Sequence, residues 1–98
     1  MMDYITEENR IFSEDEYKKI IAEITFPTRD SSRMDIDHVY VDESHRGQGI
    51  ASHLMELAYA EIKLRGKKIV AKCPYAISWF KKHEEYQDIV INVKTKKL

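Results

Sequence analysis

The stretch that decides the fold is a short glycine loop, and it reads Arg46-Gly47-Gln48-Gly49-Ile50-Ala51. Before it, residues 34–41 alternate in polarity and become apolar on both faces, which is typical of a β-strand with a covered end. After it, residues 49–65 carry apolar side chains at helical spacing, and Gly66 supplies a stop. The loop is therefore predicted to join a strand to a helix.

The residues after this helix complete a repeating unit of secondary structure. Residues 67–73 return to an extended pattern, and Pro74 suits the first turn of a second helix predicted over residues 75–83. A strand, a helix and a strand in this order form a crossover unit, whose two strands normally run parallel. We therefore expect strands 34–41 and 67–73 to be parallel. Glu61 interrupts the apolar face of the first helix, and Arg65, one turn later, can pair with it.

The residues ahead of residue 34 predict antiparallel strands joined by polar turns. Residues 20–26 place alternate apolar side chains on one face, and shorter strands are expected at 4–6 and 9–13. Residues 89–93 are a candidate edge strand. The sequence thus predicts one α/β domain over residues 1–98. Its mixed sheet (α+β) has antiparallel N-terminal strands, then a parallel strand–helix–strand unit and a second short helix.

Composition excludes several classes of partner. Lys and Arg total 16 against 17 for Asp and Glu, and a net charge of −1 gives no broad field for nucleic acid or anionic lipid. No apolar run approaches the ~18 residues that a bilayer-spanning helix needs. A single cysteine cannot form an intrachain disulfide, which fits a reducing compartment. We expect a cytoplasmic monomer that binds neither nucleic acid nor membrane.

The glycine loop itself predicts an anion site. Glycines let the main chain approach a bulky anion, and the first amides of a helix have no intrahelical partner. The helix dipole and Arg46 add positive charge at the same place, so a diphosphate is the natural ligand. The alternative is an ordinary glycine-containing loop ahead of a helix.

Two familiar phosphate loops do not fit this stretch. A Walker loop needs Lys and then Ser or Thr after its second glycine, where this chain has Ile50. The dinucleotide fingerprint needs Gly or Ala at Ser52 and an acidic residue near the end of the next strand, where Cys73 stands. Neither loop is therefore predicted.

The stretch does match the pattern Gln/Arg-x-x-Gly-x-Gly/Ala of the GNAT superfamily of N-acetyltransferases, through Arg46, Gly49 and Ala51. The likeness extends over residues 34–90, and in this region the chain resembles the small single-domain members of that superfamily. The further residues that carry it are His38-Val39-Tyr40-Val41, Cys73-Pro74-Tyr75, Trp79, His83 and Glu85-Tyr86.

This resemblance implies an enzyme that uses acetyl-CoA as co-substrate. It implies that the loop amides hold the pyrophosphate of coenzyme A, that the preceding strand end pairs with its pantetheine arm, and that the acetyl group lies where two parallel strands splay apart. On this chain the arm would contact Val39, Tyr40 and Val41. Tyr75, at the start of the second helix, is a further candidate contact, and the alternative is that it only packs that helix. The pyrophosphate would contact Arg46, Gly47, Gln48, Gly49, Ile50 and Ala51.

Two residues near the predicted strand ends are catalytic candidates. Adjacent strands lie ~4.8 Å apart, so His38 and Cys73 can face a common cleft. An acceptor amine with a pKa of ~10.4 must lose a proton, and His38 is the natural base. Cys73 lies at a helix start, where the dipole favours thiolate, so it can carry an acetyl group or protonate the leaving thiolate. The alternatives are a histidine bonded to backbone and a small buried cysteine.

The sequence leaves the acceptor and the extent of turnover open. The extra N-terminal helices that often form the acceptor pocket of full-length GNAT enzymes are absent from the predicted elements. The acceptor could be a small polyamine, an antibiotic-like amine, a peptide terminus or a protein lysine. The alternative function is a coenzyme-A-binding or protein-interaction module with little turnover. His38, Cys73 and His83 do not form a metal-binding spacing, so no metal is expected.

Overall fold

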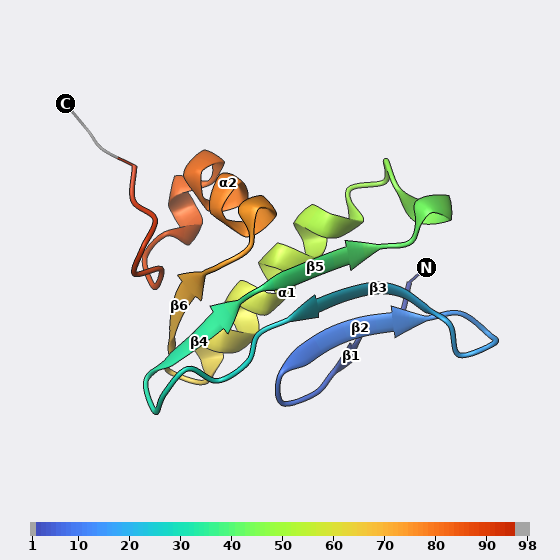
Figure 1. Ribbon diagram of the computed structural model, residues 1–98, viewed down its shortest axis with the longest axis horizontal. Coiled ribbons are helices and arrows are strands. Elements are labelled where there is room, and N and C mark those ends of the chain that lie inside the picture. The colour runs from blue at the N-terminus through green and yellow to red at the C-terminus, as the bar shows by residue number, and fades with distance from the viewer. Residues whose placement is uncertain (1, 96–98) are drawn as a thin grey trace.

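The structure is a computed structural model that describes residues 2–95. Six strands, two α-helices and two 3-10 turns follow one another within these residues (Figure 1). In order they are β1 (Ile5–Thr6), β2 (Arg10–Glu14), β3 (Ile20–Thr25), β4 (Arg33–Ile36), β5 (His38–Val41), η1 (Glu43–His45), α1 (Ile50–Leu64), β6 (Lys68–Ala71), α2 (Pro74–Lys82) and η2 (Glu84–Tyr86).

The strands form two hydrogen-bonded sheets. One has four antiparallel strands in the order β1-β2-β3-β5, and the other is a parallel pair of β4 and β6. The parallel pair is joined by α1, so the predicted crossover unit and the mixed α/β fold are confirmed.

The predicted strand 34–41 is divided at Asp37, and the expectation of one continuous parallel strand is wrong. Up to Ile36 the strand pairs with β6, and the Ile36 carbonyl accepts from the backbone N–H groups of Lys72 (2.8 Å) and Cys73 (3.3 Å). The Asp37 N–H instead donates to the Thr25 carbonyl at 3.3 Å, and β5 continues along β3. The change of partner separates β5 from β6 and opens a fork between them.

The N-terminal strands follow the predicted pattern closely. Ala22, Ile24 and Phe26 are fully buried, as the alternation in β3 predicts, and Ile21 on the opposite face is buried as well. Residues 89–93 do not form the predicted edge strand, because they make only an isolated bridge between Ile69 and Val90. In place of backbone pairing, the side-chain amide of Asn92 bonds to the backbone of Ala71. Its Oδ1 accepts from the Ala71 N–H at 2.9 Å, and its Nδ2 donates to the Ala71 carbonyl at 2.8 Å.

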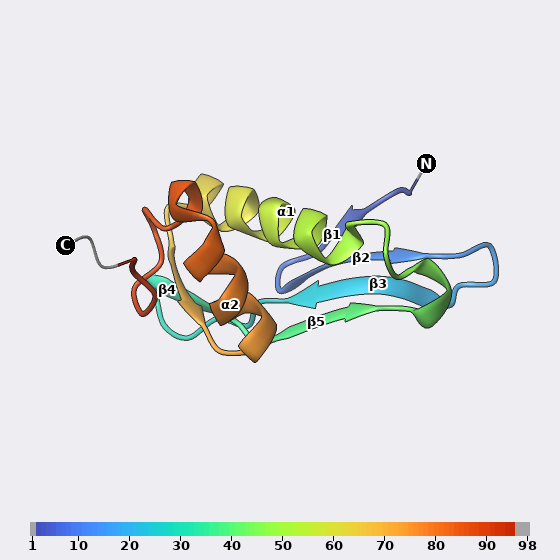
Figure 2. The same cartoon turned by 90° about the horizontal axis from the view of Figure 1, so that it is seen from above.

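Helix α1 positions the site. It buries Leu54, Ala58 and Ile62 completely, and these side chains share one core with β3 and β6. Figure 2 shows α1 along one face of β2, β3 and β5, while no described helix runs along the opposite face. Burying this apolar stripe supplies most of the stability of the helix, as is usual for helices of this length. Within residues 2–95, neither helix has the length and apolar character that crossing a membrane would require.

Candidate active site

Two adjoining cavities lie at the fork, beside the outer edge of β5. The larger has a volume of about 380 Å³ and the smaller about 150 Å³. Both are lined by Val41, Arg46, Ala51 and Tyr75, so they form one continuous cleft from β5 to the start of α1. We call the pair the fork cleft.

The glycine loop forms one end of the fork cleft. Gly47 and Gly49 have φ angles of 83° and 75°, a left-handed conformation that other residues adopt at a cost. A Cβ at either position would meet no atom within 4 Å, so the backbone angle rather than crowding demands glycine. Gly49 is the N-cap of α1 and makes no side-chain cap, which leaves the first helical amides free to bind an anion.

Arg46 is fixed at the mouth of the fork cleft. Its Nε donates to the carbonyl of Val41 at 3.1 Å, across the turn that connects β5 to the loop. Asp42 stabilises the same turn by accepting bonds from the backbone and hydroxyl of Ser44 and by pairing with Lys19 at 3.3 Å. The Ser44 bonds and then the Lys19 ammonium hold the pKa of Asp42 well below its usual range. The turn is therefore held at neutral pH with a guanidinium beside the exposed amides.

The walls of the fork cleft come from β5 and α2. Val39 and Val41 pack against the hydrophobic core, whereas Tyr40 projects to the other face and donates to Asp42 at 3.2 Å. Tyr75 is 41% exposed at the second position of α2. Partial burial, and then the charge of Cys73 when ionised, raises the pKa of Tyr75, which keeps its hydroxyl protonated. Apolar walls and a hydroxyl suit a long, mostly apolar ligand arm.

The structure brings nine of the ten predicted coenzyme contacts to this cleft. They are Val39, Tyr40, Val41, Arg46, Gly47, Gly49, Ile50, Ala51 and Tyr75. Gln48 lines instead a separate cavity of about 420 Å³ together with Met2, Ser13 and Glu14. The side chain of Gln48 therefore lies apart from the other nine, although its backbone belongs to the same loop.

The two catalytic candidates lie beside the fork cleft rather than in its lining. Cys73 is the N-cap of α2, where its Sγ accepts from the Ala76 N–H at 3.3 Å. His38 is exposed at the start of β5, and its ring stacks on Tyr40 with centroids 6.5 Å apart. Neither residue lines the two cavities. Among the described residues the His38 ring has no hydrogen-bond partner, so the alternative of a backbone-bonded histidine does not describe it.

Two residues that line the smaller cavity, His45 and Ser52, were not among the predicted site residues. Ser52 lines the smaller cavity, and its hydroxyl accepts from the Trp79 indole N–H at 2.7 Å. This bond joins the first turn of α1 to α2. Ser52 lies three residues after Gly49, in the first turn of the helix, which is the turn that would face a bound anion. This spacing was the signal by which the sequence could have identified Ser52. Among the described side chains, no group of three or more His, Cys, Asp and Glu residues is arranged to hold a metal ion.

Comparisons with known proteins agree with this architecture. A sequence model of the GCN5-related N-acetyl-transferase family matches residues 10–89. A search of curated proteins gave no match. A GCN5-like protein from Staphylococcus aureus, solved by NMR, is 27% identical with a TM-score of 0.78, over 95% of this chain and 91% of that one.

Two larger solved structures share the fold. A GNAT family N-acetyltransferase from Escherichia coli in complex with CoA is 22% identical, with a TM-score of 0.55 over 63% of this chain and 38% of that one. A GNAT family acetyltransferase from Elizabethkingia anophelis with acetyl-CoA bound is 21% identical, with a TM-score of 0.54 over 63% and 40%. This chain therefore spans less than half the length of either complex. The family model covers most of the chain and the fold agrees with it, so the chain belongs to the GCN5-related N-acetyltransferases, a family of acetyltransferases.

Proposed function

We propose that the protein transfers the acetyl group of acetyl-CoA to an amine, with coenzyme A bound in the fork cleft. The observation that supports this most is the continuity of the cleft: one pair of adjoining cavities runs from the edge of β5 to the amides at the start of α1. The pyrophosphate would bind at the loop beside Arg46, and the pantetheine arm would extend along β5.

The free edge of β5 supports this placement of the arm. β5 ends the four-stranded sheet, so its outer backbone groups have no strand partner among the described residues. An amide-containing arm can pair with such an edge as an added strand does. Val39 and Val41 would then bury its apolar parts on one side, with Tyr75 opposite.

The transfer needs two proton movements. The neutral amine nitrogen attacks the thioester carbon, the N–C bond forms and the C–S bond breaks, and coenzyme A leaves as a thiolate. His38 takes the proton that the amine loses, because its exposed ring lies beside the fork on β5. The thiolate takes a proton from Tyr75 or Cys73. Tyr75 is the better placed of the two, since it lines both cavities and Cys73 lines neither.

Calorimetric titration with coenzyme A tests the binding site. Arg46→Glu replaces a charge-assisted contact with repulsion, and we expect the affinity to fall by about tenfold to a hundredfold. Lys81→Glu, an equal charge change at an exposed position on α2, is the matched control and should leave the affinity within about twofold. Equal affinity of Arg46→Glu and the unsubstituted protein would place the pyrophosphate elsewhere.

A coenzyme-A-binding module with little turnover is the second candidate function, and one observation favours it: His38 and Cys73 both lie outside the cavity lining. Amine-dependent release of free thiol from acetyl-CoA distinguishes the two. An acetyltransferase should release thiol faster when an amine is added, and His38→Ala should slow that release without weakening coenzyme A binding. Binding without amine-dependent release would support the module.

A further inference from the structure

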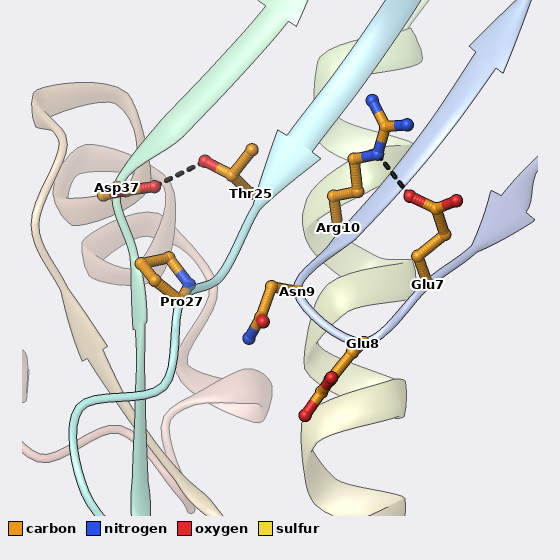
Figure 3. Close-up of a pocket in the computed structure, with 7 residues that line it drawn as sticks. All are labelled: Glu7, Glu8, Asn9, Arg10, Thr25, Pro27 and Asp37. Atoms are coloured by element: carbon orange, nitrogen blue, oxygen red, sulfur yellow. Dashed lines mark hydrogen bonds and ion pairs between the residues drawn. The ribbon is translucent and has the colours of Figure 1, made fainter.

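A further cavity lies outside the fork cleft and has no role in the proposed binding of coenzyme A. It has a volume of about 550 Å³ and is lined by the β1–β2 turn (residues 7–9), Arg10, Thr25, Pro27 and Asp37. Figure 3 shows these side chains around one opening, with α1 behind the strands. The cavity therefore lies on the sheet face that no described helix covers (Figure 2). We call it the turn cavity.

The turn cavity is built on a fixed turn. Arg65, from the end of α1, donates to the carbonyls of Glu8 (2.5 Å) and Glu7 (3.1 Å) and pairs with Glu61 at 2.7 Å. The Asn9 amide donates to the Phe26 carbonyl at 3.1 Å, so its Oδ1 remains available as an acceptor. The predicted Glu61–Arg65 pair thus orients a guanidinium that holds the turn against α1. A turn held from two sides presents its side chains in a pre-formed arrangement.

Carboxylates outnumber cations in the turn cavity. Glu7, Glu8 and Asp37 line it against one cation, Arg10. Arg10 is already neutralised, because it pairs with Glu7 at 2.6 Å and with Glu23, outside the cavity, at 2.9 Å. Glu8 has no ion-pair partner among the described residues, and Asp37 accepts only the Thr25 hydroxyl. The cavity therefore presents negative charge and acceptor oxygens to a ligand.

A row of side chains on one face of the sheet leads from the turn cavity towards the fork cleft, and the two share no lining residue. Asp37 lies at the point where β4 and β5 separate, and His38 follows it. His38 lies opposite Thr25 in the β3–β5 register, so the two side chains lie on the same face of the sheet, the one that no described helix covers. The His38 ring then stacks on Tyr40, which lines the fork cleft. The candidate base thus lies between an acidic cavity and the coenzyme cleft.

We propose that the turn cavity is the acceptor site and selects a primary amine that carries a second positive charge. This inference rests on the acetyl transfer proposed above and narrows its acceptor. The distal ammonium is held by the Glu8 carboxylate and the Asn9 Oδ1. The reacting nitrogen extends past Asp37 to His38, loses its proton there and meets the thioester at the fork. An amine of equal length without the second charge leaves these acceptors unpaired and binds more weakly.

Steady-state kinetics with two amines tests the selection. 1,6-Diaminohexane and 1-aminohexane have the same chain length and differ by one ammonium group. We expect kcat/KM to be higher for the diamine by about tenfold or more, mainly because its KM is lower. Glu8→Gln/Asp37→Asn should reduce that preference to about twofold, and Glu8→Gln alone should reduce it in part. Glu16→Gln/Glu85→Gln, an equal charge change at exposed positions elsewhere, should keep it. Equal kcat/KM for the two amines, or an undiminished preference in the double variant, would overturn the proposal.

A binding measurement separates this proposal from the proposed function. Titration of 1,6-diaminohexane into the CoA-saturated protein should shift the backbone amide resonances of residues 7–9 and Asp37, and this requires no turnover. Shifts at these amides with no thiol release would retain the acceptor site and overturn the acetyl transfer. Turnover of the diamine with no shift at these amides would retain the transfer and overturn the acceptor site.

Discussion

The two ends of β5 offer opposite environments to a ligand. At its C-terminal end, helix amides and Arg46 surround a cleft suited to an anion. At its N-terminal end, Glu8 and Asp37 line a cavity suited to a cation. A four-residue strand separates them by roughly 13 Å. Although the net charge is only −1, positive and negative groups are therefore concentrated at opposite ends of β5. An anionic acetyl donor and a cationic acceptor can then approach the same strand without competing for one site.

The largest effect is expected from Gly49→Val, which disrupts only the proposed anion site at the start of α1. A β-branched residue at a φ of 75° costs of order 1–3 kcal/mol and distorts the start of α1. We expect coenzyme A affinity, measured by calorimetry, to fall by more than about tenfold. The chemical shifts of residues 7–9 should respond to 1,6-diaminohexane as before. A variant that lost both responses while still folded would show that the two ends are not independent.

Arg65→Ala is the converse experiment, because it releases the β1–β2 turn and leaves the glycine loop intact. Its guanidinium makes two hydrogen bonds to the turn and one ion pair, so we expect a loss of about 1–3 kcal/mol in the free energy of unfolding. KM for 1,6-diaminohexane should rise while coenzyme A affinity stays within about twofold. Arg65→Lys keeps the charge but not the forked geometry. Its free energy of unfolding and its KM should therefore lie between those of Arg65→Ala and the unsubstituted protein. An unchanged KM in Arg65→Ala would mean that the turn does not depend on this contact.

The smallest effect is expected from pH. The folded-state pKa of Asp42 lies below its usual value, so its contribution to stability is present above about pH 3.9 and is lost as the pH falls further. Asp42→Asn should therefore flatten the dependence of the urea midpoint on pH below 4. Asp30→Asn is a matched control, because Arg33 and Ser32 lower the pKa of Asp30 in the same way. Both variants should flatten the profile, and only Asp42→Asn should weaken coenzyme A binding.

The sequence predicted the junction of strand, glycine loop and helix well because that junction is local. The strand, the loop and the start of α1 follow one another over residues 38–51, and each has a pattern that a single segment reveals. Gln48 was the exception, because a side chain in a loop can point to either side.

The fork and the turn cavity could not be predicted in the same way. The division at Asp37 depends on a carbonyl of β3 and on two amides beyond β6, and alternation within residues 34–41 contains no sign of either. The turn cavity depends on Arg65 reaching carbonyls 57 and 58 residues away. The Glu61–Arg65 pair was predicted from its helical spacing, but its link to the turn required the tertiary structure.

The bond between Trp79 and Ser52 gives the protein an optical probe of its own. Trp79 is the one tryptophan of the chain, and its indole N–H reaches a hydroxyl that lines the smaller cavity of the fork cleft. The same indole stacks on His83 with ring centroids 4.0 Å apart. Indole emission depends on hydrogen bonding and on neighbouring rings, so a ligand that moves Ser52 changes the fluorescence of the whole protein. Occupancy of the proposed coenzyme site should thus be measurable in real time without a label.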